Sequence, residues 1–104
     1  MVDHQKLIQW ISESKQVGKV FSYDRDGELC WSSVAIQKWK GVIKVYVDEI
    51  MESQMDAENY LREEIIVFDT IESAIDYIST TTMTAPEELT PCKGQKIFNP
   101  EFDL

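Results

Sequence analysis

The sequence predicts an α+β fold in which helices cover one face of a mostly antiparallel, four-stranded sheet. Three observations carry this prediction: a helical spacing of apolar residues near the start, a run of alternating segments separated by tight-turn residues, and a second helical spacing that follows an apolar strand. The 104 residues are 43% hydrophobic, which is enough for one core, so we expect a single domain over residues 1–104.

The first helix is predicted over residues 3–14. Asp3 can cap its N-terminus, and Leu7, Ile8 and Ile11 fall on one side at helical spacing. Gly18 follows and is available to end the helix.

A β-meander is predicted next. Its first strand covers residues 19–24, where β-branched and aromatic residues alternate with polar ones. Asp26 and Gly27 form a two-residue hairpin turn, because both central positions of such a turn need a positive φ. The returning strand covers residues 29–37.

A turn over residues 38–41 leads to a third strand over residues 42–47. Its alternation predicts that Ile43, Val45 and Val47 face one side of the sheet. Lys44 and Tyr46 then face the other side.

Residues 49–61 are harder to assign. Ile50, Met51 and Met55 fall at helical spacing, so a helix is predicted, with a loop as the alternative. Met51 and Met55 are then either the buried side of that helix or apolar anchors of an interface, because methionine serves both purposes.

The apolar run over residues 64–68 predicts a buried fourth strand. Thr70 can cap a second helix, whose apolar stripe is formed by Ile71, Ala74, Ile75 and Ile78. Residues from about 84 to 104 contain all the prolines and predict an irregular C-terminal strap with one helical turn near residues 84–89. Ile97, Phe98 and Phe102 suggest that this strap docks on the domain.

The charge is concentrated in one stretch. The chain has 19 acidic and 10 basic residues, a net charge of −9, and residues 48–76 hold ten acids and one base. The negative electrostatic potential of this stretch repels nucleic-acid phosphates and anionic lipid. We therefore expect neither nucleic acid nor a membrane as a partner. The same potential favours a cationic protein as the binding partner. The alternative is that these acids only keep the protein soluble.

The residue types that carry most catalysis and metal binding are scarce. His4 is the single histidine, Cys30 and Cys92 lie far apart in sequence, and the four glycines match no phosphate-binding loop. We therefore expect a binding protein rather than an enzyme, with no metal or cofactor. The first residues match no secretory signal, so a cytoplasmic location is expected, with Cys30 as a small buried residue.

The candidate partner-binding residues combine carboxylates with aromatic anchors, the residue type enriched at interfaces. They are Glu49, Glu52, Asp56, Glu58, Tyr60 and Glu63, together with Trp39.

The acidic stretch 48–76 and the strand-to-helix segment 65–78 resemble the small acidic immunity proteins that bacteria make beside a secreted toxin, including those of contact-dependent growth inhibition systems. The resemblance implies an inhibitor that binds its cognate toxin one to one. The toxin is often a basic nuclease, and the inhibitor's carboxylates block its active site. The alternative is a small cytoplasmic regulatory or adaptor domain that binds a protein through Trp39 and the C-terminal tail, with acids that only solubilise.

Overall fold

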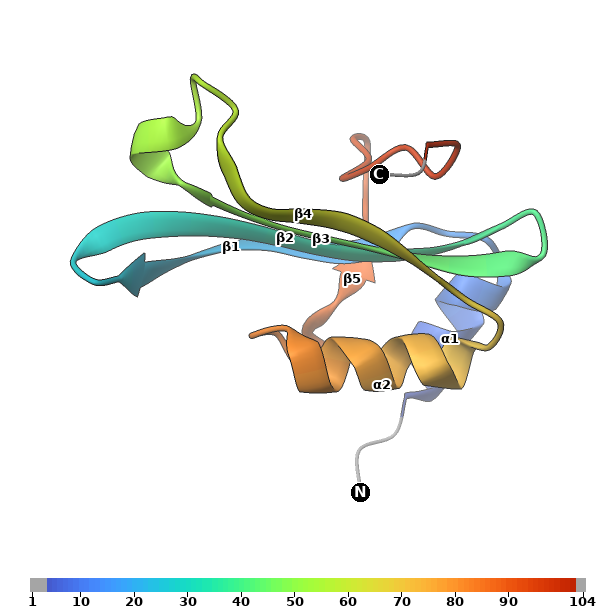
Figure 1. The fold of residues 1–104 in the computed structure, drawn as a ribbon. Coiled ribbons are helices and arrows are strands. Elements are labelled where there is room, and N and C mark those ends of the chain that lie inside the picture. Colours follow the sequence, from blue (N-terminus) through green and yellow to red (C-terminus); the bar gives the residue numbers. More distant parts are fainter. Residues whose placement is uncertain (1–3, 103–104) are drawn as a thin grey trace.

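The computed structural model describes residues 4–102, which form an antiparallel five-stranded sheet with both helices on one face (Figure 1). In chain order the elements are α1 (Gln5–Ser12), β1 (Val17–Arg25), β2 (Glu28–Trp39), β3 (Val42–Met51), the 3-10 turn η1 (Glu52–Gln54), β4 (Tyr60–Phe68), α2 (Ile71–Thr81), the 3-10 turn η2 (Pro86–Glu88) and β5 (Thr90–Pro91). The strand order is β4-β3-β2-β1-β5. The α+β class is therefore confirmed, and the strand that the sequence did not predict is the two-residue β5. The predicted cap Asp3 lies outside the described residues.

Two tight turns build the meander of β1, β2 and β3. Asp26 and Gly27 have φ values of 51° and 84°, and Lys40 and Gly41 have φ values of 48° and 85°. Both turns thus have two residues with positive φ, the hairpin turn that matches the twist of the flanking strands. The predicted Asp-Gly turn is confirmed, and the second turn is shorter than the predicted 38–41.

The predicted helix over residues 49–61 is wrong. β3 continues to Met51, η1 follows, and β4 begins already at Tyr60. The reason is the length of β2, whose residues Cys30 to Ser33 offer backbone partners to residues 48–51. Pairing with a neighbouring strand overrides the local helical spacing, which was too short to stabilise a helix by itself.

The main core lies between the sheet and the helices. Ile36 of β2 and Val45 of β3 are fully buried there, together with Ile11 of α1 and Ile78 of α2. The side chain of Thr70 accepts a hydrogen bond from the backbone of Ser73 at 3.1 Å, so the predicted N-cap of α2 is confirmed. The predicted role of Gly18 is wrong, because α1 ends at Ser12 and Gly18 lies within β1.

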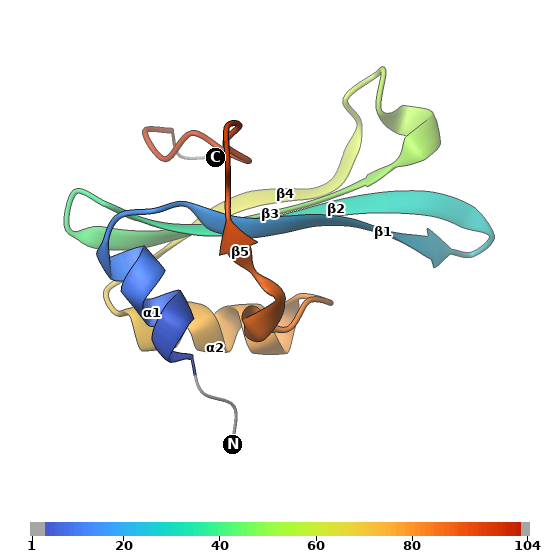
Figure 2. The ribbon, with the colours of Figure 1, turned by 180° about the vertical axis from the view of Figure 1, so that it is seen from behind.

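The C-terminal segment, residues 92–102, crosses the opposite face of the sheet (Figure 2). The Phe98 ring stacks on Tyr46 with centroids 5.4 Å apart. The side-chain oxygen of Gln16 accepts hydrogen bonds from the backbone of Ile97 and Phe98, and Lys44 donates to the carbonyl of Pro100 at 2.9 Å. The predicted docking is confirmed for Ile97 and Phe98, whereas Phe102 is 63% exposed.

Candidate protein-binding surface

Carboxyl groups gather at one end of the sheet, where the β1–β2 turn lies beside the β3–β4 connection. The hydroxyl of Ser53 in that connection donates a hydrogen bond to Glu28 in the turn, so the two loops are in contact. We call this region the acidic end. Its acidic residues are Asp24, Asp26, Glu28, Asp48, Glu49, Glu52, Asp56, Glu58, Glu63 and Glu64. Arg25 and Arg62 are the bases at this end, so most of the chain's net charge of −9 lies here.

This grouping differs from the stretch that the sequence indicated. Asp69, Glu72 and Asp76 belong to residues 48–76, but β4 carries the chain to the other end of the sheet before α2 begins. The tip of the β1–β2 hairpin contributes three acids instead, namely Asp24, Asp26 and Glu28. The hairpin register was the signal that could have found them, because a long β2 brings the end of β3 back to this turn.

The two arginines at the acidic end already have partners. Arg62 donates from Nε and Nη2 to Glu64 at 2.8 and 2.6 Å, and also from Nη2 to the hydroxyl of Tyr77. The hydrogen bonds from Arg62, together with one that the Tyr77 hydroxyl donates to Glu64 at 2.8 Å, lower the pKa of Glu64. Arg62 Nη1 lies 3.8 Å from Glu49, and Arg25 Nη1 lies 4.0 Å from the same carboxylate. Glu49 therefore faces the helix side of the sheet and is largely neutralised within the chain.

On the opposite face, Tyr46 lies between two carboxyl groups. Its hydroxyl is 2.9 Å from Asp48 Oδ2 and 2.9 Å from Glu63 Oε2. A hydroxyl has one hydrogen to donate, so the second carboxyl group must bring its own proton or face an unfavourable oxygen contact. Asp48 and Glu63 are also directly opposite on neighbouring strands, where like charges destabilise the sheet. Burial raises the pKa of Asp48. Two carboxyl groups placed this close together repel each other when both are charged.

The remaining candidate residues other than Trp39 extend this surface, together with Trp31. Trp31 donates from its indole nitrogen to Glu52 at 3.4 Å, and Tyr60 beside Glu63 is 41% exposed. Asp56 and Glu58 lie exposed in the β3–β4 connection. Met55 is 45% exposed and Met51 is half-buried, so Met55 does not form the buried side of a helix. The acidic end thus combines open carboxylates with partly exposed aromatic rings.

Trp39 does not belong to this surface. It lies on β2 eight residues beyond Trp31, about 26 Å away at the rise of a strand. Its ring is half-buried, with Lys40 Nζ 5.6 Å from the ring centroid.

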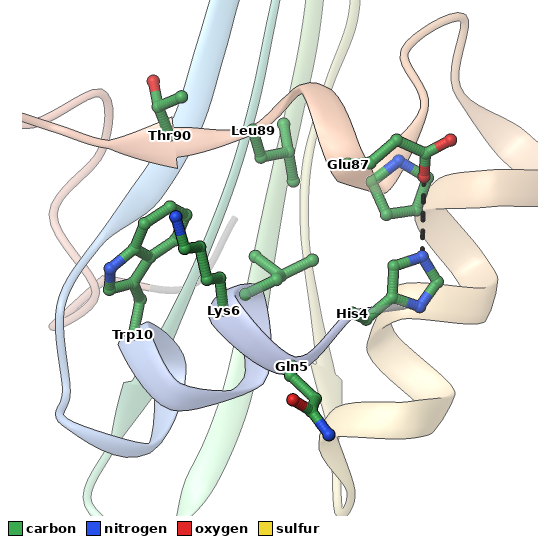
Figure 3. Close-up of a pocket in the computed structure, with 9 residues that line it drawn as sticks. His4, Gln5, Lys6, Trp10, Glu87, Leu89 and Thr90 are labelled. Carbon is green, nitrogen blue, oxygen red and sulfur yellow. Dashed lines mark ion pairs between the residues drawn. The ribbon is translucent and has the colours of Figure 1, made fainter. Parts of the chain in front are cut away.

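Two grooves lie on the surface, one on each face of the sheet. One of about 460 Å³ lies between α1 and η2, lined by Trp10, Lys6 and the pair His4–Glu87, whose Nε2 and Oε2 atoms are 3.5 Å apart (Figure 3). The other, of about 210 Å³, lies beside Tyr46 and Glu63 on the opposite face and is also lined by Ile97, Phe98 and Phe102 of the C-terminal segment.

Within residues 4–102, no three histidine, cysteine or acidic side chains are arranged to hold a metal ion. The same part of the chain has no helix of the length and apolarity that crossing a membrane requires. Cys30 is fully buried, as predicted.

The fold and the surface together define a small α+β protein with a strongly acidic end. Comparisons of the chain with protein-family models, with curated proteins and with solved structures each returned no match.

Proposed function

We propose that the chain is an inhibitor of the immunity-protein kind, which binds one cationic toxin domain through the acidic end and covers its active site. The gathering of ten carboxyl groups at one end of the sheet, from two connections and the strand ends beside them, is the observation that carries this proposal. A charge cluster of one sign raises the rate at which an oppositely charged protein arrives.

A nuclease domain is the toxin class that fits best. Its active site must hold phosphate and is therefore surrounded by positive charge. Both arginines at the acidic end already have carboxylate partners. Exposed carboxylates such as Glu52, Asp56 and Glu58 are thus left to lie where substrate phosphates would bind.

The proposal is tested by rescue of cells that express a candidate toxin, namely a basic C-terminal domain encoded immediately upstream of this chain. We expect co-expression of the chain to restore growth. The double variant Glu52→Lys/Asp56→Lys should lose much of this protection, because it places positive charge against a positive partner.

The matched control is Glu72→Lys/Asp76→Lys, which makes the same charge change on α2, away from the acidic end. It should protect as well as the unmodified chain. Equal protection by both variants would remove the acidic end from the mechanism, and failure of the unmodified chain to protect would reject that toxin as its partner.

A regulatory or adaptor domain is the second candidate function, and the position of Trp39 is the observation that favours it. A half-buried tryptophan beside Lys38 and Lys40, remote from the acidic end, is a separate anchor for a protein partner. In that case Trp39→Ala weakens binding, whereas the lysine variants at the acidic end do not.

A further inference from the structure

The outer edge of β4 is open. β4 is the last strand in the order β4-β3-β2-β1-β5, and no other segment of residues 4–102 pairs with its outer side. The other edge of the sheet is different, because β5 pairs with β1 at Val17 and Gly18.

The second half of β4 lacks the features that usually protect an edge strand. Proteins protect such edges with charged residues, prolines or bulges, since unpaired backbone groups invite another strand. Residues 65–68 are Ile, Ile, Val and Phe, with no charge, proline or glycine. The register irregularity of β4 lies at its other end, opposite Glu49 and Ile50. Val67 is 49% exposed.

We propose that this half of β4 pairs antiparallel with the same segment of a second copy of the chain, about a two-fold axis near Ile66. Residues 65–67 are then placed against themselves: Ile66 lies opposite the partner's Ile66, and Ile65 lies opposite the partner's Val67. Phe68 lies opposite the partner's Glu64, at the margin of the contact. A two-fold axis requires such a self-complementary segment, and an antiparallel pair completes the backbone hydrogen bonds of both edges.

The charge distribution argues for this arrangement and against the parallel one. The acidic end lies at the Tyr60 end of β4, and the proposed contact lies at the Phe68 end. Antiparallel pairing directs the two acidic ends away from each other, whereas parallel pairing would bring them together. The β1–β2 turn and the β3–β4 connection of both copies also stay open, so this dimer is independent of the proposed inhibitor function.

The test is the mass in solution by analytical ultracentrifugation of the full chain. At about 200 µM we expect a species of twice 12.1 kDa that dissociates on dilution. The dimer fraction should rise between about 0.05 and about 0.5 M salt, because salt screens the repulsion between two chains of net charge −9.

Val67→Glu should give a monomer, because it places a charge in the apolar contact. Val67 is 49% exposed within the chain, so the glutamate carboxylate reaches water and the fold is kept, as circular dichroism would verify. Val20→Glu is the matched control, since Val20 is 55% exposed on β1, away from this edge, and it should remain a dimer. A monomeric wild-type chain at this concentration overturns the proposal, as does a dimer that persists in Val67→Glu or is lost in Val20→Glu.

Discussion

The hydroxyl of Tyr46, shared by Asp48 and Glu63, ties the stability of the fold to pH. Burial raises the pKa of Asp48 above its ordinary value, so the folded state binds this proton more tightly than the unfolded state does. The stabilisation from that proton is fully present below the unfolded value of about 4. It is lost as the pH rises through the folded pKa.

We therefore expect Asp48→Asn to raise the melting temperature at about pH 8 relative to the wild type, by an amount that shrinks towards about pH 4. The amide can donate to the Tyr46 hydroxyl, which is then free to donate to Glu63, and the remaining amide oxygen still accepts from the backbone of Ser33. The gain at pH 8 should be up to about 1 kcal/mol, the size of a cross-strand charge effect.

Thermal melts across this pH range measure the effect. Asp76→Asn on the exposed side of α2 is the control and should leave the pH profile unchanged. A variant Asp48→Asn that melts lower than the wild type at pH 8 would show that the carboxylate of Asp48 stabilises the fold.

At the scale of the elements, the side chain of Gln16 holds the C-terminal segment, residues 92–102, to the sheet. Gln16, just before β1, accepts hydrogen bonds from Ile97 and Phe98 at 2.6 and 3.2 Å and donates to the Phe98 carbonyl at 2.9 Å. Gly18 leaves room for the Ile97 side chain, because a Cβ there would lie 2.6 Å from both Ile97 Cδ1 and the Val34 carbonyl oxygen.

Gln16→Leu is expected to release this segment locally. It leaves the amides of Ile97 and Phe98 without their acceptor, at a cost of about 1 to 3 kcal/mol for each buried group. Hydrogen exchange should show faster exchange at these two amides, with the amides of α2 unchanged as the internal control. Unchanged protection at Ile97 and Phe98 would mean that the Phe98–Tyr46 stack holds the segment without Gln16.

The elements also show where sequence patterns suffice and where they do not. The Asp-Gly turn and the Thr70 cap are set by local backbone chemistry, and both could be predicted. The extension of β3 to Met51 could not, because it depends on backbone partners that β2 supplies from some twenty residues away. The candidate surface shows the same difference. The sequence alone indicates the acids from Asp48 to Glu64, whereas the place of Asp24, Asp26 and Glu28 beside them follows only from the strand register.

At the scale of the whole molecule, the fold places the acidic end and the open apolar edge of β4 at different parts of the sheet. One end of the sheet carries acids on two connections and on the strand ends beside them. The C-terminal segment covers part of the face opposite the helices (Figures 1 and 2). Trp39 lies at the end where β2 turns into β3. Three separate surfaces, namely the acidic end, the Trp39 end and the β4 edge, therefore remain available, and the charge of the first one determines what it attracts.

The central claim is that the acidic end captures a cationic protein, and the association rate constant with the toxin domain found by rescue tests it most directly. In stopped-flow mixing at low salt, we expect Glu52→Lys/Asp56→Lys to associate about tenfold more slowly than the wild type and to show a weaker salt dependence. Glu72→Lys/Asp76→Lys should behave more like the wild type. Equal rates and equal salt dependence for the wild type and the Glu52→Lys/Asp56→Lys variant would contradict the claim.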